Sequence, residues 1–208
     1  MIIAVDGPAA AGKGTIARAL AEHYGLPFLD TGLLYRMVGR AVLDEGEDPR
    51  DSAAAIRAAR CLDPSRYKDA DLRSEAVGDA ASVVAVIPEV REALLGFQRD
   101  FAGEPPGAVL DGRDIGTVVC PHAAVKIFVT ASPEVRAHRR ARELAETGMP
   151  ADYPTVLADI RARDERDSRR IAAPLVPAPD AFVLDTSAME IDEAVKTAIV
   201  VVESKMSR

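Results

Sequence analysis

The chain has 208 residues, of which 48% are hydrophobic and 28% charged, with a formal net charge of -7 and an isoelectric point near 5.1. This composition is typical of a globular protein, and the acidic balance argues against a protein whose main task is to grip nucleic acid. No apolar run approaches the roughly 18 residues of a membrane span, and the N-terminus lacks the basic segment of a secretory signal. Two cysteines without metal-ligand spacing exclude a disulfide framework. We therefore expect a cytoplasmic protein with no nucleic-acid or membrane partner, and a monomer by default.

Five short apolar runs predict the strands of a parallel sheet, because they are near-continuous rather than alternating. Helical patterns lie between them, so the chain is predicted to adopt an α/β three-layer fold with helices on both faces of the sheet. Helix starts are predicted at Ser132 and at Ser187, the second as a capping box with Glu190, and helix ends at Gly25 and Gly148. The predicted strands are 2–5, 27–29, 108–110, 125–129 and 181–184.

Two other segments carry structural signals only. Residues 44–75 are polar and mixed in charge, with a short helical pattern at 52–60, and we interpret them as a small insertion. The last helix is predicted to bury a stripe at helical spacing. That stripe comprises Ile191, Val195, Ile199 and Val202.

The strongest signal for function follows the first strand directly. Residues 6–15 read D-G-P-A-A-A-G-K-G-T, in which Gly7, four residues, Gly12 and Lys13 match the phosphate-binding loop. In such a loop the backbone N–H groups and the start of the next helix bind phosphate oxygens, and the lysine neutralises the β- and γ-phosphates. We therefore expect ATP to bind along Gly7, Pro8, Ala9, Ala10, Ala11, Gly12, Lys13, Gly14 and Thr15.

Gly14 stands where the general motif has a serine or threonine that ligates Mg²⁺. We therefore expect Mg²⁺ to be held mainly through phosphates and water, with no metal site built from protein ligands alone. Asp111, at the end of an apolar strand, and Asp6 are both candidates for a carboxylate that orients those waters. A turn residue at a strand end is an equally good interpretation of Asp111.

Four further segments narrow the chemistry. They are L-D-T-G-L-L-Y-R at 29–36, D-G-R-D-I-G-T-V-V at 111–119, V-K-I-F-V-T-A-S-P-E-V-R at 125–136 and R-D-S-R-R-I-A-A-P-L at 166–175. With the phosphate loop, they resemble the bacterial cytidylate kinases, which are P-loop nucleoside monophosphate kinases. The resemblance runs from Ile3 to about Thr186. It implies one P-loop kinase domain over 1–208, with an acceptor-binding insertion at 31–105 and a short lid at about 139–170. It also implies in-line transfer of a phosphoryl group from ATP to CMP or dCMP, in pyrimidine nucleotide metabolism.

The resemblance also implies roles for individual residues. Arg36 and Arg113 would bind the acceptor phosphate, and a carboxylate from Asp114 would read the amino group of cytosine, beside Arg91 and Ser82. Each has an ordinary alternative, such as a surface ion pair for an arginine or a bond from Ser82 to its own helix backbone. The implied acceptor site comprises Thr31, Arg36, Ser82, Arg91, Arg113, Asp114, Arg163 and Asp167.

Residues 161–170, R-A-R-D-E-R-D-S-R-R, hold five of the 21 arginines. On a helix, Arg163, Arg166, Asp167 and Arg170 share one face. A solvated face of ion pairs is one interpretation. With the phosphate loop present, we favour Arg163, Arg166 and Arg170 as cations that act with Lys13 on the transferred phosphoryl group, with Arg139 or Arg140 beside them.

Two rival functions stay open at this point. One is a kinase of the same class acting on UMP, AMP or a small hydroxylated metabolite. The other is a nucleotide-dependent switch, although the chain contains no asparagine and so lacks the Asn-Lys-x-Asp motif of GTP-binding switches. The family often carries a small extra sheet where this chain has only residues 61–73, which leave no room for three strands.

Overall fold

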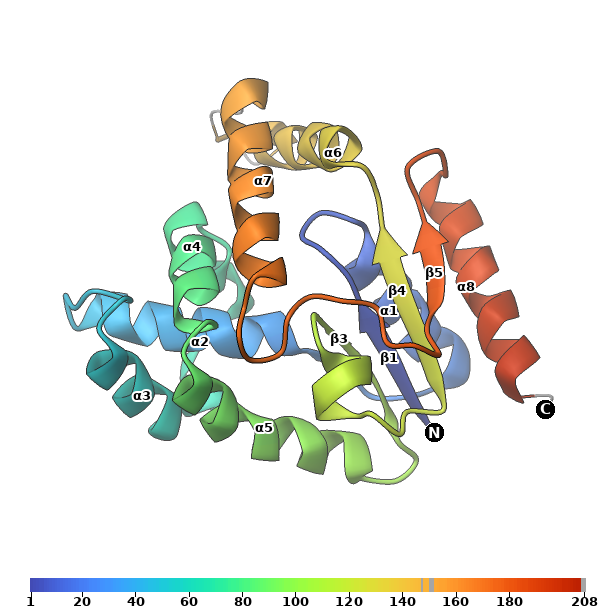
Figure 1. Cartoon of the computed structure of the whole chain (residues 1–208), viewed down its shortest axis with the longest axis horizontal. Coiled ribbons are helices and arrows are strands. Elements are labelled where there is room, and N and C mark those ends of the chain that lie inside the picture. The colour runs from blue at the N-terminus through green and yellow to red at the C-terminus, as the bar shows by residue number, and fades with distance from the viewer. Residues whose placement is uncertain (147, 150–151, 207–208) are drawn as a thin grey trace. The chain divides into compact units, whose positions relative to one another are not determined.

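The computed structural model describes residues 1–146, 148–149 and 152–206. The chain divides into two compact units, which Figure 1 shows in the colours of the sequence. The first unit combines Met1–Leu29 with Ala102–Arg208, and the second consists of Asp30–Phe101. The second unit overlaps the range 31–105 that was predicted to bind the acceptor, and its role in binding stays a prediction.

The first unit is built on one five-stranded parallel sheet, in the order β2-β3-β1-β4-β5. The predicted sheet is therefore confirmed, and each strand coincides with one of the apolar runs. At the edge of the sheet, however, Phe182 is 40% and Val183 53% exposed, so the last run is less buried than its composition suggests. The strands are β1 (Ile2–Asp6), β2 (Phe28–Asp30), β3 (Ala108–Gly112), β4 (Val125–Thr130) and β5 (Phe182–Asp185).

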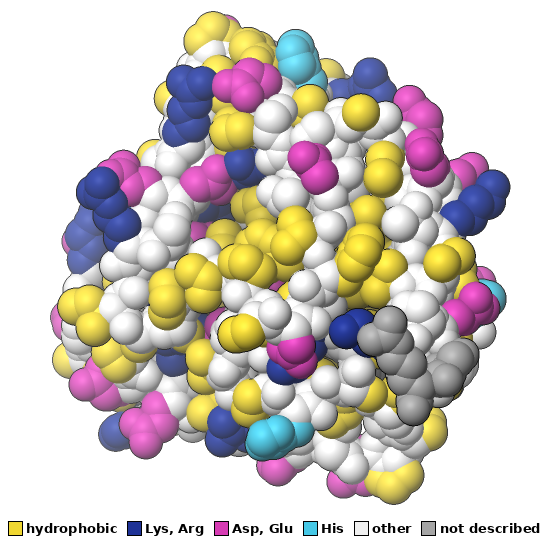
Figure 2. Space-filling view, turned by 45° about the vertical axis from the view of Figure 1, so that its right-hand side comes forward, with side chains coloured by type: hydrophobic (Ala, Val, Ile, Leu, Met, Phe, Trp, Pro, Cys, Tyr) yellow, Lys and Arg dark blue, Asp and Glu magenta, His cyan; other side chains and the backbone are white. Residues whose placement is uncertain are grey.

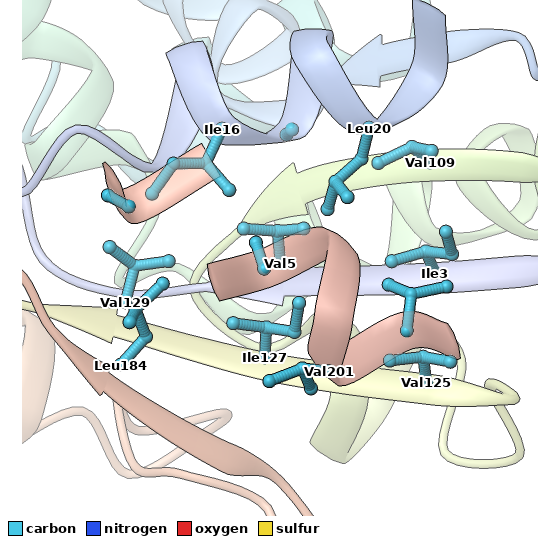
Figure 3. Close-up of a cluster of buried hydrophobic side chains, with 14 of the residues drawn as sticks. Ile3, Val5, Ile16, Leu20, Val109, Val125, Ile127, Val129, Leu184 and Val201 are labelled. Carbon is cyan, nitrogen blue, oxygen red and sulfur yellow. The ribbon is translucent and has the colours of Figure 1, made fainter. Parts of the chain in front are cut away.

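Helices α1 (Lys13–Tyr24) and α8 (Ile191–Met206) pack on one face of this sheet. Figure 3 shows the shared core, with Ile3, Val5 and Ile127 of the strands facing Leu20 of α1 and Val201 of α8. Strand residues alternate between the two faces, so Asp6 and Lys126 point to the opposite face. There they meet the π-helical turn η3 (Ile115–Val119). This unit also carries α6 (Pro133–Glu146) and α7 (Tyr153–Ser168), which pack against each other.

Among the predicted helix termini, the end at Gly25 and the start at Ser132 are confirmed, and the start at Ser187 is wrong. Helix α1 ends at Gly25, which has a left-handed φ of 62°, and Ser132 Oγ accepts a hydrogen bond from Val135 N at the start of α6. The capping box at Ser187 is wrong, because α8 begins only at Ile191. The hydroxyl and the N–H of Ser187 instead donate to Asp185 Oδ1, at 2.6 and 2.8 Å, which forms a turn before the helix. The predicted end near Gly148 is also confirmed, because α6 ends at Glu146 and Gly148 has a left-handed φ of 73°.

The buried face of α8 is also shifted from the predicted stripe. Ile191 is 44% exposed, and Val195 and Ile199 are only partly buried, whereas Val202 is buried as predicted. Alanines line the face that packs on the sheet and on α1, where close approach favours small side chains. The buried residues of this helix are Ala194, Ala198, Val201 and Val202.

The second unit is helical in its described part. Its helices α2 and α4 approach closely at Gly39, where an added Cβ would lie 2.9 Å from the Cβ of Ala80. Residues 61–73 form two short 3-10 helices and no strand, as predicted. The elements are α2 (Thr31–Asp44), α3 (Ser52–Arg60), η1 (Pro64–Arg66), η2 (Asp69–Leu72), α4 (Glu75–Val84) and α5 (Pro88–Gly103). The last two residues of α5 belong to the first unit.

Candidate active site

The predicted phosphate loop connects β1 to α1 and has the backbone geometry of such a loop. Gly7 has a φ of 152°, and an added Cβ would lie 2.0 Å from Val129 O of the neighbouring strand, so only glycine fits there. Gly12 has a φ of 85° and precedes α1, which begins at Lys13. Ala10 adopts a left-handed φ of 59°, a conformation that is unfavourable for a residue with a side chain. The loop therefore ends at a helix N-terminus, where backbone N–H groups and the positive end of the helix dipole favour an anion.

Lys13 and Asp111 meet beside the loop. Lys13 Nζ lies 3.1 Å from Asp111 Oδ1, and the Asp111 side chain is only 3% exposed. A Cβ on Gly14 would lie 3.1 Å from Asp111 Oδ2, so a serine or threonine there would crowd this carboxylate. The glycine that replaces the usual Mg²⁺-binding hydroxyl therefore makes room for Asp111 next to the lysine.

Asp6, the other candidate carboxylate, binds the turn after β3. Its two oxygens accept hydrogen bonds from the N–H groups of Ile115 and Gly116, both at 2.8 Å. Burial raises the pKa of Asp6 to about 7; the two N–H bonds oppose the shift, while nearby Asp114 and Asp111 add to it. Asp6 therefore holds the turn that follows Arg113 and Asp114, and Asp111 is the carboxylate at the phosphate loop.

This pKa predicts how the stability contribution of Asp6 depends on pH. Between about pH 4 and pH 7 the folded protein keeps a proton on Asp6 that the unfolded chain releases, so stability falls as pH rises through this range. We expect the unfolding free energy of the wild type, minus that of Asp6→Asn, to fall by a few kcal/mol from pH 4.5 to pH 7.5. Urea unfolding of both proteins at several pH values measures this difference. A difference that is constant across the range would contradict the prediction.

A buried ion-pair cluster brings three of the predicted site residues together in the first unit. Arg113 Nε donates to Asp167 Oδ2 at 2.9 Å, and Arg170 donates to the other oxygen of the same carboxylate. Asp167 is 1% exposed. Burial disfavours its charge, but Arg113, Arg170 and Arg163 together outweigh this and hold the pKa of Asp167 below its ordinary value. The ionised carboxylate thus gathers arginines from two separate segments of the chain.

One detail of the arginine prediction needs correction. Helix α7 ends at Ser168, so Arg170 lies beyond it and does not share its face, although it still reaches Asp167. Arg139 donates to Thr186 Oγ1 at 3.0 Å and to Thr186 O at 2.7 Å. A role for Arg139 or Arg140 beside the lid arginines stays a prediction. The predicted lid, about 139–170, includes residues 147, 150 and 151, which lie outside the described residues.

The second unit carries four of the predicted residues of the acceptor site. Arg36 donates to Leu72 O at 2.7 Å, and Gly78 leaves room beside its guanidinium, because an added Cβ would lie 3.2 Å from Nη2. Arg91 donates to Ala85 O at 3.1 Å and lies over the Tyr35 ring. Thr31 and Ser82 are both 3% exposed. Their roles as substrate ligands stay a prediction.

Arg136 is a residue of the site that the sequence analysis did not single out. It is 3% exposed and bonds to the phosphate loop at Ala9 and to α7 at Asp164. The sequence shows it only as one of nine arginines between 136 and 170, so its partners were not visible. Within the described residues, no group of three or more His, Cys, Asp or Glu side chains could bind a metal ion by itself.

A sequence profile of the cytidylate kinase family matches residues 3–204. Curated relatives named cytidylate kinase include one from Rhodopseudomonas palustris, 61% identical over 204 residues, that covers 98% of this chain and 96% of its own length. This chain belongs to the cytidylate kinase family. Another relative, from Methylocella silvestris, is 63% identical over 98% of this chain and 94% of its own.

Solved structures at lower identity agree with the fold of this cytidylate kinase family member. A protein of unassigned function from Eubacterium ventriosum aligns with a TM-score of 0.56 at 17% identity, over 98% of this chain and 99% of its own. A gluconokinase from Sinorhizobium meliloti aligns with a TM-score of 0.50 at 19% identity, over 97% and 91%. These likenesses concern the fold alone, which is an α/β fold of the P-loop kinase kind.

Proposed function

We propose that this cytidylate kinase family protein transfers the γ-phosphoryl group of ATP to CMP, and to dCMP, to form the diphosphate and ADP. The observation that carries the proposal is the family match over residues 3–204, together with relatives about 60% identical across 98% of the chain. The phosphate loop and the buried arginine cluster supply the two parts that such a transfer needs, an anion site and cations for the transferred group.

On the ATP side, the loop N–H groups would bind phosphate oxygens and Lys13 would move from Asp111 toward the β- and γ-phosphates. The ion pair between Lys13 and Asp111, at 3.1 Å, supports this because it holds the ammonium group at the mouth of the loop. Asp111 would then be left to accept hydrogen bonds from water around Mg²⁺. The magnesium ion would neutralise phosphate charge when bound, and the carboxylate chemistry of Asp111 suits it.

On the acceptor side, we propose that the second unit binds the nucleotide. Arg36 would bind the acceptor phosphate, and its present bond to the Leu72 carbonyl would orient it. Thr31, Ser82 and Arg91 would contact the nucleotide from the same unit. In the first unit, Arg113 and Asp114 follow β3, and Arg113 is oriented by Asp167 at 2.9 Å. Asp114 would accept a hydrogen bond from the amino group of cytosine.

The transfer itself needs no side-chain nucleophile, because the acceptor phosphate is already an anion. Charge neutralisation and alignment of the two substrates carry the rate. We propose that Arg163, Arg166 and Arg170 act as cations toward the transferred group. Asp167 supports this role, since it holds Arg170 in a buried position rather than leaving it in solvent.

An acceptor panel tests the proposal. ADP formation from Mg·ATP is measured with CMP, dCMP, UMP, AMP, GMP and no acceptor. We expect rapid turnover with CMP and dCMP, and rates at least about 100-fold lower with the purines, because the binding site would lose paired hydrogen bonds to the base. Preference for UMP or AMP would reject the assigned base contacts. One slow rate with every acceptor would point to a nucleotide switch.

The surface carries charges of both signs. Basic and acidic side chains are mingled over the face that Figure 2 presents, in keeping with the net charge of -7. None of the described helices combines the length and apolar character that a membrane span requires. We propose a monomer in the cytoplasm, with ATP and CMP or dCMP as its binding partners.

A further inference from the structure

Arg136, on α6, contacts the phosphate loop, and its guanidinium group donates four hydrogen bonds. Nε donates to Ala131 O at 2.9 Å, Nη1 to Ala9 O at 3.2 Å and to Asp164 Oδ1 at 3.0 Å, and Nη2 to Asp164 Oδ2 at 2.5 Å. The side chain is 3% exposed. One buried cation thus joins the loop that follows β1, the start of α6 and the middle of α7.

The bond to Ala9 bears on the orientation of the loop. In a planar trans peptide, the C=O and the following N–H point in opposite directions. Since the Ala9 carbonyl is directed at Arg136, the Ala10 N–H is directed away from it. Ala10 has a left-handed φ of 59°, which an alanine adopts only when its surroundings hold it there. The hydrogen bond from Arg136 is one contact that holds this peptide.

The bond to Asp164 bears on the arginines of α7. Asp164 directly follows Arg163 and precedes Asp167 by three residues, so it lies on the helix that carries two of the proposed catalytic cations. Its carboxylate accepts two bonds from one planar guanidinium, a geometry that fixes direction as well as distance. A lysine at position 136 would retain the charge but could not form this fork.

We propose that Arg136 is a positioning residue for phosphoryl transfer. It bonds to both the phosphate loop and α7, and so fixes the Ala9–Ala10 peptide relative to the helix that carries Arg163. The inference rests on the proposed binding of ATP in the loop. Arg136 itself touches no substrate in this account. Its effect passes through the loop peptide to ATP affinity and through Asp164 to turnover.

A second bridge between α6 and α7 provides a matched control. Arg161 donates to Glu134 at 2.8 Å, but these side chains are 60% and 50% exposed and neither bonds to the loop in the described contacts. Glu134→Gln therefore weakens a contact between the same two helices without touching the loop peptide. We expect this variant to keep wild-type ATP affinity and turnover.

The test compares the wild type with Arg136→Lys, Asp164→Asn and Glu134→Gln. Calorimetry measures the Kd of Mg·ATP without acceptor and the Kd of CMP alone, and steady-state kinetics measures kcat. We expect Arg136→Lys to raise the ATP Kd about 10-fold and to lower kcat about 10- to 100-fold, with the CMP Kd unchanged. Asp164→Asn, which leaves the hydrogen bond from Arg136 to Ala9 O in place, should lower kcat about 10-fold and change the ATP Kd less than Arg136→Lys does.

The outcomes separate positioning from stability. Unchanged ATP Kd and kcat in Arg136→Lys, measured well below its melting temperature, would overturn the proposal even if that temperature fell. If Arg136→Lys does not fold, Asp164→Asn decides, and wild-type kcat in that variant would overturn the proposal. Failure of the wild type to bind Mg·ATP would instead reject the proposed function, so the two failures are distinguishable.

Discussion

Lys13→Ala is expected to lower kcat by about 10³-fold or more, because it removes the cation nearest the transferred phosphoryl group in our account. The position of Lys13 fits this proposed role. Its ammonium group lies 3.1 Å from the buried Asp111 carboxylate, at the first residue of the helix that follows the loop. A neutral side chain there would leave the β- and γ-phosphates without a cation at the loop itself.

The measurement is ADP formation with saturating Mg·ATP and CMP, with thermal unfolding to show that the variant is folded. Lys196→Ala is a matched control, since Lys196 is an exposed lysine on α8. We expect this control to retain wild-type kcat. Turnover of Lys13→Ala within ten-fold of the wild type would contradict the proposed mechanism.

Asp167→Asn is expected to lower both stability and activity. The substitution removes the negative charge shared by Arg113 and Arg170, in a position that is 1% exposed. Breaking a buried pair on one side leaves cations unpaired and costs about 3 kcal/mol or more of unfolding free energy at pH 7. Because Arg113 would also lose the bond that orients it, we expect kcat/KM for CMP to fall about 100-fold.

The pH dependence of this effect has a definite sign. The pKa of Asp167 is lowered in the folded protein, so its contribution is full above the unfolded value near 3.9 and is lost as the pH falls through the folded value. The unfolding free energies of the wild type and Asp167→Asn, measured in urea, should therefore differ most at neutral pH and converge in acid. Glu165→Gln, a substitution on the same helix that removes an exposed pair with Arg169, should change the unfolding free energy by less than about 1 kcal/mol. Equal losses in the two variants would contradict the assignment.

The parts of the fold that depend on local pattern could be predicted from the sequence. Apolar runs located all five strands, because buried parallel strands have a composition that loops and surface helices lack. The phosphate loop could be predicted because backbone geometry requires its glycines. At Gly7, for example, an added Cβ would lie only 2.0 Å from Val129 O. A local pattern also misled at Ser187, where the competing partner Asp185 belongs to the preceding strand.

The partners of the charged residues could not be predicted, because they lie far apart in the chain. Asp6 and Asp111 were both candidates in the sequence. In the structure, Asp6 accepts hydrogen bonds from the N–H groups of residues 115–116, whereas Asp111 forms an ion pair with Lys13. Arg136 stands 127 residues from Ala9 and 28 from Asp164. No periodicity within α6 distinguishes it from its neighbouring arginines.

The most direct test of the central claim follows the γ-phosphate of ATP. The wild-type protein is incubated with CMP and ATP that carries radiolabel on its γ-phosphate, and the labelled products are separated. We predict label in CDP, in an amount equal to the ADP formed, with little label in inorganic phosphate. Label released as inorganic phosphate at the same rate with and without CMP would contradict phosphoryl transfer to a nucleotide.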